Sequence, residues 1–191
     1  MRTVENEIFV HLNTTADYQV GKTYEFGKMT NPFFRYYDEF EPLVTKPRDE
    51  LLMEYMLYVR ECLFEDVRQS KYPSCPSRMS CIWLLPDDNQ SLDYWARVIP
   101  RHVNVVKFKC SGVIHEADER YLALQTFNIP LQKRLADLYW SGESITKGLA
   151  HKEFLFAGSA TVLGLYPPHQ VPILEAPENQ LADQTQVQQH D

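Results

Sequence analysis

The chain has 191 residues, of which 44% are hydrophobic and 13% aromatic, and its formal net charge at pH 7 is −7. These values are sufficient for one domain with a full apolar core, and they exclude an intrinsically disordered chain. Because the net charge is negative, the protein surface as a whole does not attract nucleic acid. A local basic cleft would still bind it.

Targeting signals and cysteines indicate the compartment. The first seven residues are polar and acidic, no apolar region of a signal peptide follows them, and no apolar run is long enough to cross a bilayer. The four cysteines have no Cys-x-x-Cys spacing, so we interpret Cys62, Cys75, Cys81 and Cys110 as reduced and mostly buried. We therefore expect a cytoplasmic protein, and without paired ligands we expect no metal site.

The N-terminal stretch predicts two strands. Residues 8–10 form a short apolar run that ends in His11, polar residues 13–15 follow, and a second β-rich run covers residues 23–26. A histidine at the end of a buried strand has two interpretations. It points into the cleft that the strand borders, or it is a core histidine bonded to a neighbouring carbonyl.

The next segment is rich in aromatic residues and leads into the clearest helix. Behind a turn at Asn31, four aromatic residues either complete the edge of the core or line a pocket: Phe33, Phe34, Tyr36 and Tyr37. A helix is predicted over residues 49–68, because apolar residues recur there at helical spacing and charged residues form the opposite face. We interpret this helix as scaffold.

Arg78 precedes a predicted central strand over residues 79–85, and a helix that contains Tyr94 follows over residues 92–98. An arginine at the entry of a buried strand is either a surface or ion-paired residue, or a clamp for a phosphate or carboxylate.

A half-exposed strand is predicted over residues 103–110, with Lys107 and Lys109 on its exposed face. The two lysines form a basic patch with Arg97, Arg101 and His102, which is either a solvated face or a site for a phosphate backbone. The elements expected after this strand are a break at residues 111–112, helices over 116–125 and 130–140, a loop over 143–150, and strands over 151–158 and 160–166.

Glu153 stands at the start of the strongly apolar strand predicted over residues 151–158. A carboxylate beside a buried strand is costly unless it is paired, exposed or used in chemistry, so Glu153 is either an exposed strand-edge charge or a functional group. From Pro167 onward proline and glutamine dominate. We therefore expect one domain over residues 1–166 and a flexible tail over residues 167–191.

Three features occur in order along the chain: a strand ending in His11, a strand with Trp83 followed by a helix with Tyr94, and a strand beginning at Glu153. In this order they resemble the ADP-ribosyltransferase superfamily, in the branch whose site is built from His, Tyr and Glu. Residues after His11 are similar to the start of small bacterial members, and residues 76–85 and 153–158 are similar to an uncharacterised bacterial family of that fold. The likeness spans residues 8–164. It implies an α+β fold with a split, mixed β-sheet as its core and flanking helices.

The resemblance implies a cleft that binds NAD as a co-substrate. His11 would hold a ribose hydroxyl, and backbone groups at Leu12 would hold the nicotinamide carboxamide. Glu153 would stabilise the positive charge that develops on the ribose as nicotinamide leaves, and it would orient or deprotonate the acceptor. Trp83 stands where the superfamily has a tyrosine, and either Trp83 or Tyr94 would stack on the nicotinamide. The resemblance assigns four further residues to the cofactor, the first three of them on its diphosphate or adenine side: Arg78, Asn13, Thr14 and Ser80.

The implied function is mono-ADP-ribosyl transfer to a macromolecular acceptor, either nucleic acid or protein. Compact members of the superfamily often resemble toxins of toxin–antitoxin systems or antiphage effectors. We therefore expect a neutralising protein partner, with residues 33–37 or the tail as docking sites. Two alternatives are an interaction protein on this fold that has lost catalysis, which Trp83 favours, and an NAD glycohydrolase, which uses water as the acceptor.

Overall fold

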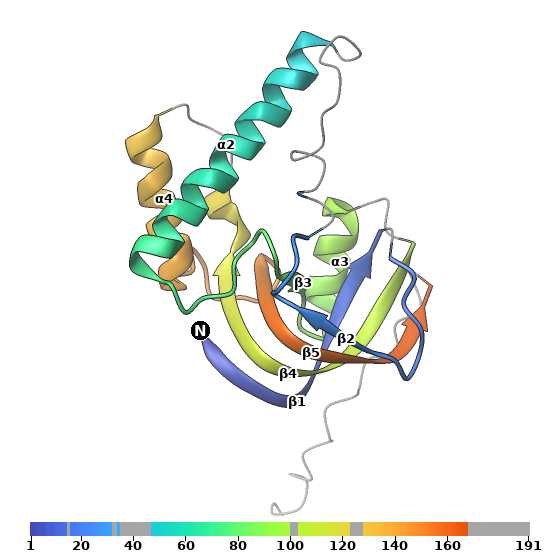
Figure 1. Ribbon diagram of the computed structural model, residues 1–191. Helices are drawn as coiled ribbons and strands as arrows, with labels where there is room; N and C mark the ends of the chain where they lie inside the picture. Colours follow the sequence, from blue (N-terminus) through green and yellow to red (C-terminus); the bar gives the residue numbers. More distant parts are fainter. Residues whose placement is uncertain (15, 32–33, 35–46, 100–102, 123–127, 168–191) are drawn as a thin grey trace, which may run out of the picture.

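The computed structural model describes residues 1–14, 16–31, 34, 47–99, 103–122 and 128–167. Within them the fold is α+β, as expected, with a five-stranded sheet and three α-helices (Figure 1). The strands are β1 (Arg2–Asn13), β2 (Thr23–Phe26), β3 (Ile82–Leu84), β4 (Asn104–Asp118) and β5 (Lys152–Tyr166). The helices are α2 (Arg48–Lys71), α3 (Asn89–Val98), α4 (Ile129–Ser141) and the short 3-10 helix η2 (Glu119–Leu122).

The sheet is antiparallel at every pairing that the described residues make, so the expectation of a mixed sheet is wrong for this part of the chain. The strand order is β1-β4-β5-β2, and β3 pairs with β5 beside β2. The physical reason is that β4 and β5, the two longest strands, run against each other over their whole length. Figure 1 shows β1, β4 and β5 side by side as long, strongly bent strands.

β3 connects the two sides of this bent sheet. It pairs with the first half of β5, and directly after it Leu85 forms an isolated bridge with Val10 of β1 through hydrogen bonds of 3.0 and 2.8 Å. In the described residues, backbone pairing beside β3 and β1 is limited to this one bridge, whereas the other neighbouring strands are paired over ladders of several residues. The sheet therefore curls back on itself and is only narrowly joined beside His11.

Each face of the sheet has its own core. We call the face that carries Phe9, Phe108 and Phe156 the inner face, because these side chains pack together in one apolar cluster. The outer face is covered by helices in two places. α2 and α4 pack together over Leu155 and Ala117, and α3 packs over Val10 and Leu85. These large apolar contacts determine which side of each strand is available for chemistry.

The helix ends follow familiar local chemistry. In α3, Asp88 is the N-cap and accepts a hydrogen bond from the backbone N–H of Ser91. In α4, Asn128 caps the N-terminus by accepting from Leu131, and Gly142 ends the helix in the left-handed conformation, with φ of 80°. In the described part of the chain, no helix combines the length and apolar character needed to span a membrane.

The second half of the chain differs from the sequence expectation in three elements. β4 continues through Gly112 to Asp118, where a break and the start of a helix were expected. Glu119–Leu122 forms a 3-10 helix, and the rest of the helix expected over residues 116–125 lies outside the described residues. β5 is one strand rather than two. Lys107 lies buried in an ion pair with Asp87 at 2.8 Å, so the prediction that it is exposed is wrong.

Other expectations are confirmed or lie outside the described residues. All four cysteines are free, and three of them are buried. Phe34 is buried, which agrees with a core role, but the rest of the aromatic segment 33–37 is outside the described residues. Arg101, His102 and the tail from residue 168 onward are also outside them.

Candidate functional site

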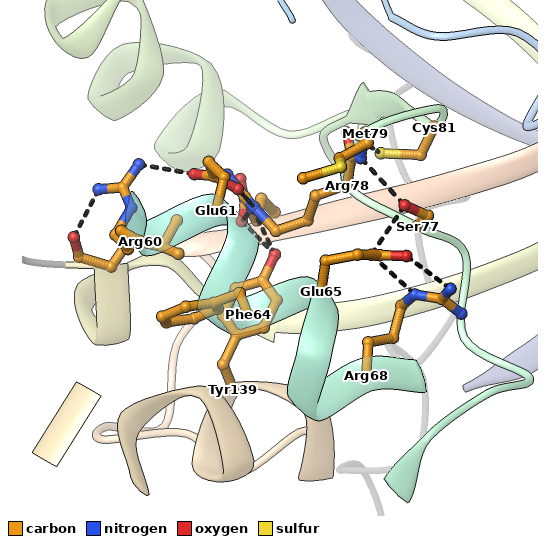
Figure 2. A network of polar contacts seen from close by, with 12 residues as sticks. Arg60, Glu61, Phe64, Glu65, Arg68, Ser77, Arg78, Met79, Cys81 and Tyr139 are labelled. Carbon is orange, nitrogen blue, oxygen red and sulfur yellow. Dashed lines mark hydrogen bonds and ion pairs between the residues drawn. The ribbon is translucent and has the colours of Figure 1, made fainter. Parts of the chain in front are cut away.

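Arg78 is the centre of a buried polar network on the outer face (Figure 2). Its Nε donates to Glu61 of α2 at 2.7 Å, and its Nη1 donates to the Tyr139 hydroxyl of α4 at 2.6 Å. Nη1 also donates to Glu153 at the start of β5, and the Tyr139 hydroxyl donates to the same carboxylate oxygen. One guanidinium therefore links α2, α4 and β5, and the ion-paired interpretation of Arg78 is confirmed.

These groups are almost completely removed from water. Arg78 is 7% exposed, Glu61 is 2% exposed and Glu153 is 5% exposed. Burial alone would raise the pKa of Glu61, but the charges of Arg78 and Arg60 outweigh it and lower this pKa. Burial would likewise lower the pKa of Arg78, yet Glu153 and Glu61 raise it well above its ordinary value. Arg78 and Glu61 are thus held charged. Because Glu153 is buried, the interpretation of it as an exposed strand-edge charge is wrong.

Trp83 lies next to this network on the same face. Its β3 position pairs with Leu155 of β5, two residues beyond Glu153. The Arg78 guanidinium carbon lies 5.6 Å from the Trp83 ring centroid, and the Phe34 ring lies 6.1 Å away. The structure therefore brings Trp83, Arg78 and Glu153 together.

His11 lies on the opposite face of the sheet from Glu153. Its ring contacts the inner-face rings of Tyr18 and Phe108, with centroid distances of 6.0 and 6.5 Å. Its Nδ1 is 2.8 Å from the carbonyl oxygen of Trp83, so the interpretation as a core histidine bonded to a neighbouring carbonyl is confirmed. Burial lowers the pKa of His11 to about 4, which keeps the imidazole neutral at pH 7.

His11 and Glu153 thus flank the same short strand, β3, from opposite faces. The structure does not bring their side chains together, because Phe9 and His11 alternate with Val10 and Leu12 along β1 and point to the inner face. The two faces meet where β1 and β3 are joined by the single Val10–Leu85 bridge.

The remaining residues assigned to the cofactor are dispersed. Leu12 is buried under α3. Asn13 donates to the Ala16 carbonyl at 2.8 Å and to Asn104 at 3.1 Å, so it closes a local turn. Thr14 is exposed, and Ser80 accepts a hydrogen bond from Gly27 N–H at 3.0 Å through its carbonyl oxygen.

Tyr94 belongs to a second cluster that the sequence did not reveal. Its hydroxyl donates to Glu119 of η2 at 2.6 Å, and the same carboxylate oxygen is 2.9 Å from His151 Nδ1. The Tyr94 and His151 rings are 4.3 Å apart. Glu119 was assigned to a helix interior and His151 to a strand end. The available signal was an ionisable residue, His151, two positions before Glu153.

A cavity of about 490 Å³ lies at the loop that leads into β5. It is lined by residues 144–149 and by Lys152, which follows His151 directly in the chain. The lining loop is anchored by Asp118, which accepts a hydrogen bond from the Ile145 N–H at 3.0 Å. Among the described residues, no group of three or more His, Cys, Asp or Glu side chains is arranged to hold a metal ion.

Comparison with known proteins gives the family. Residues 44–171, more than half of the chain, match the family described as "Protein of unknown function (DUF2441)". The fold and the two polar clusters define an α+β protein with ionisable groups gathered at the start of β5. The chain belongs to the DUF2441 family. No curated protein matches the sequence.

Proposed function

We propose that this protein is an NAD-dependent ADP-ribosyltransferase, which cleaves NAD, releases nicotinamide and transfers ADP-ribose to nucleic acid or protein. The observation that carries the proposal is the arrangement around β3. Trp83 and Glu153 share the outer face on adjacent strands, and His11 is bonded to the Trp83 carbonyl at 2.8 Å. Trp83 belongs to β3, and Glu153 and His11 belong to the two strands beside it, with their side chains on opposite faces of the sheet.

Cleavage of the bond between ribose and nicotinamide requires a carboxylate next to the ribose. As the bond between ribose and nicotinamide breaks, positive charge develops on the ribose, and a fixed carboxylate stabilises it. Glu153 would supply that charge, while Trp83 or Tyr94 would stack on the departing ring. Backbone groups at Leu12 would hold the carboxamide. For His11 to hold a ribose hydroxyl, its side chain would have to leave the inner face, where Nδ1 is bonded to the Trp83 carbonyl at 2.8 Å.

The proposal requires that Glu153 be released from Arg78. In the structure, Arg78 and Tyr139 satisfy the Glu153 carboxylate, which leaves it 5% exposed. The diphosphate of NAD is an anion that competes well for a guanidinium. Transfer of Arg78 from Glu153 to the diphosphate would free the carboxylate while Glu61 continues to bind Arg78. Binding of the dinucleotide and exposure of Glu153 would then be the same event.

The test measures nicotinamide release and labelling of macromolecules after incubation of the full chain with radiolabelled NAD and a cell lysate. We expect the wild type to label an acceptor and Glu153→Gln to lose roughly 10²-fold or more in turnover, because the substituted amide carries no charge. Glu25→Gln is the matched control, since Glu25 is an exposed residue of β2 whose ion-pair partner among the described residues is the exposed Lys28, at 3.6 Å. Absence of both nicotinamide release and labelling from the wild type would overturn the proposal.

A second candidate function is a binding protein without catalysis. The observation that favours it is that Glu153 is buried and bonded to Arg78 and Tyr139. The same experiment separates the candidates, because a binding protein releases no nicotinamide. Nicotinamide release without a labelled macromolecule would instead indicate an NAD glycohydrolase. A toxin or antiphage effector role, with a neutralising partner, is part of the first candidate alone.

A further inference from the structure

Glu119, His151 and Tyr94 form a compact acid–base cluster at the other side of the β5 start. One carboxylate oxygen of Glu119 accepts the Tyr94 hydroxyl at 2.6 Å and faces His151 Nδ1 at 2.9 Å. Burial, and then the hydrogen bond to Glu119, raise the pKa of Tyr94 to about 12, so the phenol remains a donor. Because the oxygen accepts from both sides, it fixes the hydrogen of the neutral imidazole on Nδ1.

This tautomer leaves the lone pair on Nε2. Nε2 of His151 makes no hydrogen bond with any described residue, and the His151 side chain is 33% exposed. The other two histidines of the described part differ in this respect. Burial lowers the pKa of both His11 and His115 to about 4, and both ring systems bond to backbone carbonyls. His151 is thus the described histidine whose basic nitrogen is available to a substrate.

The backbone around the cluster is fixed by hydrogen bonds from three directions. Glu119 N–H donates to the His151 carbonyl at 3.0 Å, and the Trp95 indole donates to the Lys152 carbonyl at 3.1 Å. Ser91 of α3 donates to the Leu149 carbonyl at 3.2 Å. These hydrogen bonds hold the backbone on either side of the imidazole in place.

The ionisable groups that contact the His151 ring within the described chain are Glu119 of η2 and Tyr94 of α3. Lys152, the next residue, is turned away to an ion pair with Glu116. The imidazole thus faces one carboxylate and one neutral phenol, an environment that stabilises the imidazolium formed when Nε2 takes up a proton.

We propose that His151 is the general base of the transfer step and that Glu119 is its positioning residue. This inference rests on the proposed function. Nε2 removes the proton from the attacking hydroxyl, either of the acceptor or of water, as its oxygen bonds to the ribose carbon. The bond from that carbon to the pyridinium nitrogen breaks, and its electron pair leaves with neutral nicotinamide. His151 acquires one positive charge, balancing the charge lost by NAD, and returns the proton to solvent.

The experiment uses the full chain and NAD, with water as the attacking group, and follows nicotinamide release between about pH 5 and pH 8, where histidines change charge. We expect the wild-type rate to rise with pH. His151→Gln should lower the rate roughly 100-fold at pH 7.5 and remove the rise. Glu119→Gln should shift the rise to lower pH, because the neutral amide no longer stabilises the imidazolium. Asp66→Asn, an exposed change on α2, should leave the profile unchanged.

A direct measurement keeps the inference testable if the His151 variant does not fold. Diethyl pyrocarbonate modifies neutral, accessible imidazoles, and mass spectrometry identifies the modified residue. We expect His151 to react at least tenfold faster than the buried His115, with parallel loss of nicotinamide release.

The outcomes separate the two proposals. Nicotinamide release by the wild type with an unchanged pH profile in His151→Gln, or no faster reaction of His151, would overturn the general-base assignment and leave the proposed function intact. No nicotinamide release from the wild type at any pH would overturn both.

Discussion

The Arg78 side chain joins three elements of the fold through buried hydrogen bonds. Its guanidinium contacts Glu61 from α2, Tyr139 from α4 and Glu153 from β5, all in a region with almost no exposed surface. A buried charge is stable only when it is paired, and removing one member leaves the others unpaired. Removal of Arg78 leaves Glu153 without its cation and leaves Glu61 with Arg60 alone among the described residues.

We therefore expect Arg78→Met to destabilise the protein by about 3–5 kcal/mol, since Glu61 and Glu153 lose their shared cation in a buried site. The free energy of unfolding from urea denaturation at pH 7 measures this. Lys133→Met is the matched control, because the Lys133–Asp66 pair is exposed and should contribute less than about 1 kcal/mol. A loss for Arg78→Met no larger than that of the control would show that the network contributes little to stability.

Sequence reasoning was most informative at this scale where it kept a structural alternative open. The sequence allows a core histidine bonded to a carbonyl at the end of one strand and an ion-paired arginine before another, and the structure confirms both for His11 and Arg78. Their partners could not be predicted. Glu61 is 17 positions from Arg78 and Glu153 is 75 positions away, and no local pattern connects residues at such separations.

At the scale of the elements, two glycines explain why β4 and β5 differ from expectation. Gly112 and Gly158 face each other directly across the two strands. A sequence pattern treats glycine as a break, because glycine is uncommon in strand interiors. Here the missing side chains allow the backbones to approach closely and bend, so both strands continue through their glycines. Close approach between two strands is a tertiary property, and neither segment alone predicts it.

Gly158→Ala tests this close approach. The added Cβ would lie 2.5 Å from the Ser111 carbonyl oxygen and 2.7 Å from the Gly112 Cα, at a φ of +145° that side chains rarely adopt. We expect a loss of about 3 kcal/mol in the free energy of unfolding, from overpacking and backbone strain together. Gly148→Ala is the control, because a Cβ there meets no atom within 4 Å. Equal stability of the two variants would contradict this explanation of the bend.

At the scale of the whole molecule, the hydrophobic patterns located several strands and helices and left the closure of the sheet undetermined. The strands at the two ends of the chain and the helices 49–68 and 130–140 were located from periodicity, and α2 and α4 confirm the latter. The pairing of β3 with β5 and its single bridge to β1 determine which side chains share a face. For this reason Trp83 and Glu153 lie on the same face of the sheet and His11 lies on the opposite face. Predicting these positions requires the register of three strands.

The buried histidines make the stability of the whole molecule sensitive to acid. His115 is 1% exposed, and its burial lowers its pKa from an ordinary value of 6.5 to about 4. In the unfolded chain His115 takes up a proton near pH 6.5, whereas in the folded chain it does so only near pH 4. The free energy of unfolding therefore falls as the pH decreases from 6.5 to 4. His11, with a pKa lowered to about 4 by burial, acts in the same direction.

We expect the free energy of unfolding of the wild type to be lower at pH 5 than at pH 7, with His115 alone accounting for about 2 kcal/mol. Urea denaturation of the wild type and of His115→Gln at both pH values isolates that part as the difference between their pH dependences. Asp118 does not contribute to the change in the free energy of unfolding between pH 5 and pH 7. Its Arg120 and Ile145 contacts outweigh burial and lower its pKa to about 2, so its contribution is lost only at lower pH. Equal pH dependence in the two proteins would show that His115 is protonated as readily in the folded chain as in the unfolded one.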